Sequence, residues 1–157
     1  MSLLRTVQLP INAPGRKTEM RTQFAALPWR LRDGKPQIML VTSRRTGRWI
    51  VPKGWPIDGL TPAASAAREA FEEAGIKGRP DDFCLGLYSY SKDMDGNRVL
   101  PVAVAVFPLE VKRVASAFPE KGERHAKWMS RKKAAARVSE PELAAIIKGF
   151  DPRLLRR

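Results

Sequence analysis

The stretch from Gly54 to Ile76 constrains this chain more than any other part of its sequence. Its second half is the run REAFEEAGI, residues 68–76. On a helix, Glu69, Glu72 and Glu73 take positions i, i+3 and i+4 and share one face. Because three such carboxylates repel one another, the spacing indicates a bound divalent cation. Ligands that are all oxygen, with room left for water and phosphate, favour Mg²⁺ or Mn²⁺ over zinc.

The residues around this run predict a helix with defined ends. Thr61 is suited to the N-cap and Pro62 to the first helical position. Gly75 is typical of the residue that ends a helix. A narrow apolar stripe, which predicts close packing on a sheet, consists of Ala63, Ala66, Ala67, Ala70, Phe71 and Ala74. An ordinary amphipathic helix with solvated acids is the alternative, since short acidic runs are common.

The whole segment resembles the Nudix box, a 23-residue motif with a glycine, a loop and the helical pattern R-E-apolar-x-E-E-x-G-apolar. Gly54 matches the opening glycine. The helical half is matched by Arg68, Glu69, Glu72, Glu73 and Gly75. Leu60 departs from the pattern, because the family usually has a glutamate there. That glutamate is mostly structural in the family, so we expect the departure to affect loop stability more than the metal site.

The resemblance implies an α/β protein, a Nudix-type α/β/α sandwich with a mixed β-sheet, that cleaves a pyrophosphate bond with water. It makes Glu72 and Glu73 the leading metal ligands and Glu69 a ligand or the general base. A backbone carbonyl near Lys53 and Gly54 would complete the coordination shell. Such a metal would screen the phosphate charge and activate the water.

The resemblance also assigns supporting roles. Arg68 orients the glutamates through an i, i+4 pair with Glu72. Some members take a further base from a later loop, and in this chain the candidates are Glu120 and Glu123.

The substrate class is implied by a second likeness. WIVPKG at residues 49–54, with S-R-x-x-x-R upstream, resembles the branch acting on diphosphoinositol polyphosphates and dinucleoside polyphosphates. Arginine forks suit bidentate contacts with phosphate. The expected phosphate-binding residues are Arg44, Arg48, Lys53 and Arg124, with Arg21, Lys92 and Arg98 behind them. A solvated surface charge is an equally good interpretation of each.

The charge distribution agrees with a substrate that bears many phosphates. The chain has a formal net charge of +13. Residues 1–60 carry eleven Lys/Arg against three Asp/Glu, and residues 111–157 carry thirteen against five. An acidic centre between basic flanks suits a polyanion that binds through a metal. Nucleic acid, an anionic membrane surface and simple solubility remain alternatives, of which nucleic acid is possible but not favoured.

Length and cysteine content set the outer limits. We expect residues 1–21 to form an extended, partly disordered arm and residues 22–157 a single domain. No apolar run approaches the roughly 18 residues of a membrane span, and no export signal is evident. The single cysteine, Cys84, excludes an internal disulfide and fits a reducing cytosol, so we expect a cytoplasmic protein with Cys84 in the core.

The remaining pattern predicts strands on both sides of the central helix. Strands are expected at 23–31, 37–42, 49–52, 83–91, 98–111 and 126–129, with turns at Asp33-Gly34, 77–80 and 93–97. Pro28 indicates that the first strand is an edge strand or carries a bulge. Helices are expected at 131–138, capped by Ser130, and from Leu143 after a capping box at 139–142.

Two classes of function fit these features: a metal-dependent pyrophosphohydrolase, or a non-catalytic module that binds RNA or another polyanion on a Nudix scaffold. The intact glutamates favour the enzyme, because a pure binder has no use for three crowded carboxylates. Trp49 and Trp128 are interpreted as core residues rather than stacking platforms. His125 is the only histidine, which excludes a site built from several histidines.

Overall fold

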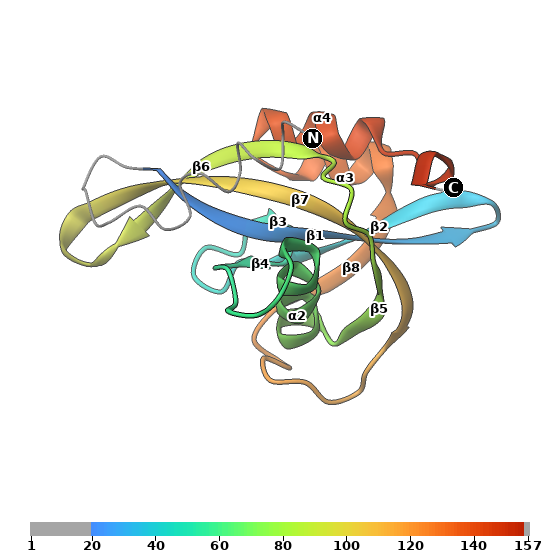
Figure 1. Ribbon diagram of the computed structural model, residues 1–157, viewed down its shortest axis with the longest axis horizontal. Coiled ribbons are helices and arrows are strands. Elements are labelled where there is room, and N and C mark those ends of the chain that lie inside the picture. Colours follow the sequence, from blue (N-terminus) through green and yellow to red (C-terminus); the bar gives the residue numbers. More distant parts are fainter. Residues whose placement is uncertain (1–19, 156–157) are drawn as a thin grey trace.

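Two long strands, β1 (Arg21–Arg32) and β7 (Arg98–Val114), run parallel to each other through the centre of the fold (Figure 1). The computed structural model describes residues 20–155. The other strands are β2 (Lys35–Thr42), β3 (Trp49–Ile50), β4 (Lys53–Gly54), β5 (Ile76–Pro80), β6 (Gly86–Met94) and β8 (Ala126–Ser130). Within the described residues they form one eight-stranded sheet with the order β3-β2-β1-β7-β5, in which β4 pairs with β1, β6 with β7 and β8 with β2. All pairs except β1–β7 are antiparallel, so the sheet is mixed.

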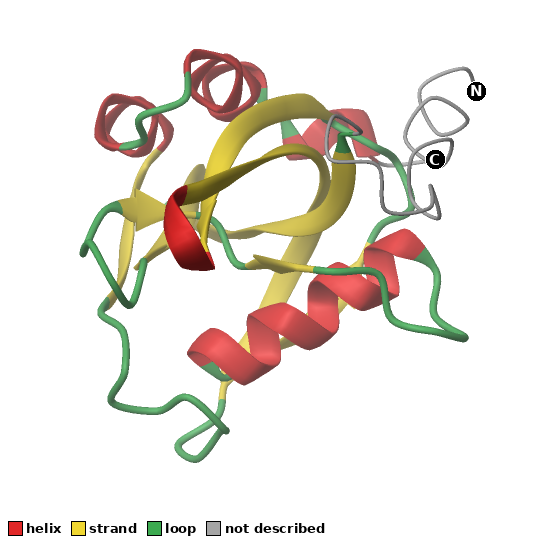
Figure 2. Cartoon of the chain, turned by 90° about the vertical axis from the view of Figure 1, so that its left-hand side faces the viewer, coloured by secondary structure: helices red, strands yellow, loops and turns green. Residues whose placement is uncertain are grey.

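Helices cover both faces of this sheet (Figures 1 and 2). The helix α2 (Pro62–Ala74) lies on one face, and α3 (Arg131–Arg137) and α4 (Pro141–Gly149) lie on the other. Short 3-10 turns span Asp95–Asn97 and Pro152–Leu155. The predicted α/β/α sandwich with a mixed sheet is therefore confirmed. No helix of the described region is long and apolar enough to cross a membrane.

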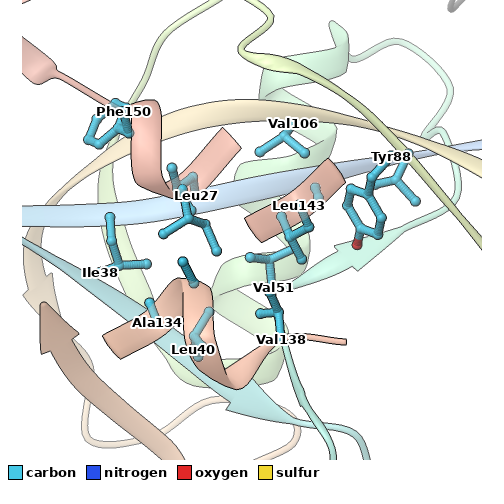
Figure 3. Close-up of a cluster of buried hydrophobic side chains, with 14 of the residues drawn as sticks. Leu27, Ile38, Leu40, Val51, Tyr88, Val106, Ala134, Val138, Leu143 and Phe150 are labelled. Carbon is cyan, nitrogen blue, oxygen red and sulfur yellow. The ribbon is translucent and has the colours of Figure 1, made fainter. Parts of the chain in front are cut away.

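The central strands are buried on both sides, because their side chains point alternately into two hydrophobic clusters, one on each face of the sheet. Leu27 of β1 and Val106 of β7 point to the α3/α4 face, where they pack with Leu143 (Figure 3). Their neighbours Ala26 and Phe107 point to the α2 face. That face is lined by small side chains, including the buried Ala63, Ala66, Ala70 and Ala74 of α2. Small residues let the helix backbone approach the sheet closely, as the apolar stripe predicted.

The aromatic and cysteine predictions are confirmed in the same clusters. Trp49 packs against the α3/α4 cluster and Trp128 against the α2 cluster, where Arg30 lies over its ring at 4.1 Å. Cys84 is buried in the α2 cluster.

Neither alternative predicted from Pro28 holds. β1 lies between β2 and β7, so it is not an edge strand, and its register with β7 runs without a shift from Arg21 to Trp29. Ala26 donates its amide to the Pro52 carbonyl at 3.0 Å, and Pro28, two residues further on, faces the same side. On that side β4 pairs as far as Ala25 and β2 begins at Trp29. Pro28 thus lies between the end of the β4 pairing and the start of the β2 pairing. No neighbouring carbonyl there needs a hydrogen bond from a backbone amide, which proline lacks.

β7 runs through Pro101 and Pro108 without a break, from Arg98 to Val114. Pro108 lies beside Leu27 in the β1–β7 register, and its carbonyl accepts from the Asp81 amide at 3.0 Å. On this side β6 pairs as far as Val106, and β5 begins opposite Leu109. Pro108, like Pro28, occupies a junction between two neighbouring strands.

The turn expected at residues 77–80 is also a strand, β5, which pairs with β7. The register shifts between Lys77 and Gly78, and a Cβ on Gly78 would lie 1.9 Å from the Glu110 carbonyl oxygen. The glycine therefore permits a close approach between strands rather than a reversal of the chain.

Several other details differ from the prediction, among them β3, which ends at Ile50 instead of residue 52. The strand expected at 83–91 begins only at Gly86 and extends to Met94. Lys53 and Gly54 form the short strand β4 rather than a loop. The capping box at 139–142 is not formed: Glu140 is the N-cap of α4 without a side-chain cap hydrogen bond, because its carboxylate lies 3.7 Å from Arg48 Nη1 instead. Ser130 caps α3 as predicted, accepting from the Lys133 amide.

The N-terminal arm predicted over residues 1–21 lies outside the described residues, apart from Met20 and Arg21. Arg21 is already the first residue of β1.

We expect Gly78→Ala to lower the free energy of unfolding by about 1–3 kcal/mol, because the added methyl group forces the Glu110 backbone away. Urea unfolding measures the change. Gly149→Ala is the matched control: a Cβ at Gly149 meets nothing within 4 Å, and alanine favours a helix. Equal stability of the two variants would contradict the close approach at Gly78.

Candidate functional site

The strand β4 and the helix α2 place Gly54 directly against Glu69. Gly54 pairs with Phe24 of β1, on the face where α2 packs. A Cβ on Gly54 would lie 2.3 Å from Glu69 Cδ. Only glycine therefore leaves room for this carboxylate beside the strand, which explains the opening glycine of the motif in steric terms.

The start of α2 is fixed as the sequence predicts. Thr61 Oγ1 accepts from the Ala64 amide at 3.1 Å, and Gly75 ends the helix with a φ of 73°. The loop before the helix is held by Ser65, whose Oγ accepts from the Ile57 amide at 3.2 Å. Leu60 is half-buried and donates its amide to Ile57 at 3.1 Å, so a main-chain turn stabilises the loop at the position where the family usually has a glutamate.

Glu73 is the most deeply buried of the three glutamates, with 6% of its side chain exposed. Its Oε2 lies 3.9 Å from Arg124 Nη2, while its Oε1 is buried and has no hydrogen-bond partner. Burial raises the pKa of Glu73 to about 7, although the charges of Arg124 and Lys53 act in the opposite direction. Burial also lowers the pKa of Lys53 to about 8, opposed by the charges of Glu73 and Glu140.

Glu69 shares this environment. Burial raises its pKa to about 7, and the charges of Glu72 and Glu120 add to the shift. Arg124 and Arg68 act in the opposite direction. The two carboxyls that flank the centre of the site are therefore both hard to ionise without a further positive charge.

A loop at residues 115–125 brings a fourth carboxylate to the last turn of α2. The amides of Glu120 and Ala115 donate to the carbonyls of Glu72 and Gly75, at 2.9 and 2.8 Å. These bonds satisfy acceptors that a helix C-terminus leaves free. A Cβ on Gly75 would lie 2.5 Å from Cδ1 of Phe118, so the ring packs directly against this glycine. The loop is thus fixed to the helix that carries the glutamates.

Arg44 and Arg48 lie on the loop between β2 and β3, about half exposed at 54% and 48%. Arg44 Nη1 donates to Glu123 Oε1 at 3.0 Å and lies 4.0 Å from Glu120. Arg48 faces Glu140, as described above, and donates from Nε to Thr46 Oγ1 at 3.3 Å. Both retain enough exposed surface to meet a ligand.

Arg124 differs from these two arginines. Only 9% of its side chain is exposed, and its nitrogens contact Glu120, Thr42 and Glu73. The remaining predicted phosphate-binding residues are dispersed. Lys92 is near enough to lower the pKa of Lys53. Arg21 is the first residue of β1. Arg98 is the first residue of β7, after the turn from β6, and its Nε donates to the Asp95 carbonyl.

The pair expected between Arg68 and Glu72 is not formed among the ion pairs of residues 20–155. Arg68 is exposed and acts on Glu69 through its charge. His125 is also exposed, and its backbone amide donates to Thr42 Oγ1 at 2.9 Å.

The sequence did not predict that Tyr88, Tyr90 and Glu140 lie near the site. Tyr90 donates to Gln23 Oε1 at 2.7 Å, and Lys53 Nζ lies 4.9 Å from the centre of the Tyr90 ring. The alternation of Tyr88 and Tyr90 on β6 was the signal that both face the same side. Glu140 was missed because its spacing suggested a capping box instead.

The donor set fits a hard divalent cation. In residues 20–155 no three His, Cys, Asp or Glu side chains stand close enough together to hold a metal ion as they are arranged. A cation bound beside Glu69, Glu72 and Glu73 would compensate the negative charges that oppose one another there. The buried Oε1 of Glu73 without a partner is the group that most requires one.

The raised pKa values of Glu69 and Glu73 predict a pH-dependent stability. Between about pH 4.5 and 7 the folded protein holds more protons on these carboxyls than the unfolded chain, so the free energy of unfolding falls as the pH rises. We expect Glu73→Gln to remove part of this fall, measured as Tm in metal-free buffer at pH 5 and pH 8. An unchanged difference in Tm between the two pH values would contradict the assignment. Adding Mg²⁺ at pH 8 should raise the wild-type Tm more than that of the variant.

Comparison with known proteins agrees with the motif. The model of the NUDIX domain matches residues 21–152. Nudix hydrolase 16, mitochondrial, of Arabidopsis thaliana is 30% identical over 118 residues, which cover 73% of this chain and 65% of that protein. Diphosphoinositol polyphosphate phosphohydrolase 3-alpha of Homo sapiens is 40% identical over 62 residues, 39% of this chain and 37% of that protein.

Solved structures show the same fold. A C. elegans Ap4A hydrolase has a TM-score of 0.61 at 19% identity, over 86% of this chain and 98% of that chain. The NUDIX domain of Shewanella oneidensis NrtR, complexed with ADP ribose, has a TM-score of 0.62 at 11% identity, over 98% and 99%. The chain spans 51–65% of the length of the three Arabidopsis relatives numbered 16, 13 and 12. Because the domain model covers most of its length, the chain belongs to the Nudix family.

Proposed function

We propose that this protein is a Mg²⁺-dependent pyrophosphohydrolase that cleaves a phosphoanhydride bond in a highly phosphorylated substrate, with Mn²⁺ as a possible replacement for Mg²⁺. The observation that carries the proposal is the buried Oε1 of Glu73, which has no partner although Glu69, Lys53 and Arg124 surround the same carboxylate. A binding module gains nothing from that arrangement, because an unpaired buried carboxylate lowers stability.

The proposed metal ligands are Glu69, Glu72 and Glu73, with a backbone carbonyl at Lys53 or Gly54. When bound, the ion screens the phosphate charge and lowers the pKa of water. The chain supplies the remaining functions. Glu69 or Glu120 takes the proton from the attacking water, since both carboxylates belong to the same centre.

The substrate proposal rests on exposed cations around that centre and on the relatives. Arg44 and Arg48 lie on one loop, and Lys53 is on the strand that delivers Gly54. Their present partners are carboxylates, Glu123 and Glu140 among them, which a phosphate would replace. Diphosphoinositol polyphosphates and dinucleoside polyphosphates, the substrates that relatives and structural neighbours are named for, both carry several phosphates.

Glu72→Gln and Glu73→Gln should each lower kcat at least about a hundred-fold, since changes beyond the direct ligands of metal sites already cost 10–100-fold. The assay compares hydrolysis with Mg²⁺ and with EDTA, and circular dichroism checks that the variants fold. Glu142→Gln, an exposed glutamate at the start of α4, is the control. Wild-type turnover by either of the first two variants would refute the metal site.

Arg44→Ala and Arg48→Ala should raise KM roughly ten-fold for substrates with many phosphates, because a charge-assisted contact contributes on the order of 1.5–3 kcal/mol. A nucleotide sugar, with only two phosphates, should be affected less. The measurement compares a diphosphoinositol polyphosphate, a dinucleoside tetraphosphate and a nucleotide sugar, with the exposed Arg137→Ala on α3 as control. Equal effects on all three substrates, or none, would leave a hydrolase without preference for polyphosphates.

A further inference from the structure

The guanidinium of Arg124 is engaged largely by the protein itself. Nε donates to Glu120 Oε1 at 2.9 Å, Nη1 donates to the Thr42 carbonyl at 3.1 Å, and Nη2 lies 3.9 Å from Glu73 Oε2. With 9% of its side chain exposed, Arg124 is far less open to solvent than Arg44 and Arg48, at 54% and 48%.

We propose that Arg124 is a positioning residue that orients Glu73 and Glu120 together, and that it does not bind the substrate phosphates. The inference rests on the proposed function, because it assigns Glu73 to the metal and Glu120 to the same centre. It replaces the expectation, drawn from the sequence, that Arg124 binds phosphate.

The main chain on both sides of Arg124 is fixed, so the guanidinium has a defined origin. The Thr42 amide donates to the His125 carbonyl, and the His125 amide donates to Thr42 Oγ1, both at 2.9 Å. At the other end of the loop the Glu120 amide donates to the Glu72 carbonyl. Arg124 therefore connects the end of β2, the loop and α2 at a single point.

This connection divides the two oxygens of Glu73 between different roles. Arg124 lies beside Oε2, and Oε1 is left buried and without a partner. Groups that contact a metal-binding carboxylate fix its orientation and affect metal affinity and activity. Toward Glu73, Arg124 acts through an ion pair at 3.9 Å rather than a hydrogen bond. Since the same fork holds Glu120 through Nε, its loss would release both carboxylates at once.

A lysine at position 124 retains the charge but not the geometry. Its single ammonium lacks the planar fork that reaches Glu120, Thr42 and Glu73 simultaneously. Arg124→Lys therefore separates positioning from charge. Arg124→Gln removes both, and on charge alone it would strengthen metal binding, because a neighbouring cation repels the metal.

The test uses the full chain with Arg124→Lys and Arg124→Gln, and Arg153→Gln as the control for a lost surface arginine. Arg153 is 85% exposed and pairs with Asp151. Mn²⁺ affinity is measured by electron paramagnetic resonance without substrate. The kinetic constants kcat and KM are measured on a dinucleoside tetraphosphate at saturating Mg²⁺. Thermal unfolding gives the folded fraction, and Arg124→Lys decides the question if Arg124→Gln does not fold.

Both Arg124 variants should bind Mn²⁺ roughly ten-fold more weakly and lose roughly ten- to a hundred-fold in kcat, with KM changed less than about three-fold. Adding Glu120→Gln to Arg124→Gln should cost less than the product of the separate losses, because the two groups act as a pair. The control should match the wild type.

Three results would overturn the inference while the wild type binds Mn²⁺ and turns over substrate. These are a raised KM with unchanged kcat, full activity and metal affinity in Arg124→Lys, or unchanged or tighter Mn²⁺ binding in Arg124→Gln. A wild-type protein that neither binds Mn²⁺ nor hydrolyses polyphosphates would instead overturn the proposed function, and this inference with it.

Discussion

A carboxylate that is almost fully buried, Glu73, imposes the charge balance on which the rest of the centre depends. Moving an ionised carboxylate out of water is unfavourable unless other charges or hydrogen bonds compensate it. Two cations, Lys53 and Arg124, offset part of this cost, yet the pKa of Glu73 is still raised to about 7. The two cations come from β4 and from the end of the loop at 115–125. Three separate elements therefore meet around Glu73, and without the two cations its pKa would be higher still.

The sheet makes this meeting possible because its long strands change partners along their length. At one end β1 is paired with β4, and beyond Pro28 it is paired with β2. Since β4 has only two residues, Gly54 is followed directly by the loop that leads to α2. The exchange of strands at Pro28 thus leaves space beside β1 for the glycine that Glu69 covers. Pro28 predicts an edge strand from the sequence, but in this fold it lies in β1, at the centre of the sheet.

Local patterns in the sequence were sufficient for the helix and its ends, but not for contacts between distant segments. The N-cap at Thr61, the C-cap at Gly75 and the shared face of the glutamates depend on residues within a few positions of one another. The partners of Arg124 do not, since Thr42 is 82 positions away. Nothing near Arg124 in the sequence distinguishes it from the exposed Arg44.

The other errors have the same origin. The sequence around Gly78 predicts a turn, because the β7 backbone opposite is not apparent from it. The spacing around Glu140 predicts a capping box, because the neighbouring Arg48 is distant in the sequence. In each case a tertiary contact replaced the local interaction that the pattern favours. The centre was found from the sequence because its acidic residues lie within one helix. The sequence identified the basic residues around the centre but not their roles. The charge of an arginine alone does not show whether it binds a ligand or another part of the protein.

Lys53 interacts through its charge with carboxylates from α2 and from the N-cap of α4, which bears on how a long substrate could be accommodated. The charges of Glu73 on α2 and of Glu140 at the start of α4 both act on the pKa of the Lys53 ammonium, which lies over the Tyr90 ring. Arg48 lies beside Glu140, and Lys92 is close enough to act on Lys53 through its charge. On the proposed function, a diphosphate held at the metal would reach as far as Lys53, and additional phosphates would extend toward Arg48 and Lys92. Bond cleavage would then depend on the glutamates of α2, and the choice of substrate on exposed cations such as Arg44 and Arg48.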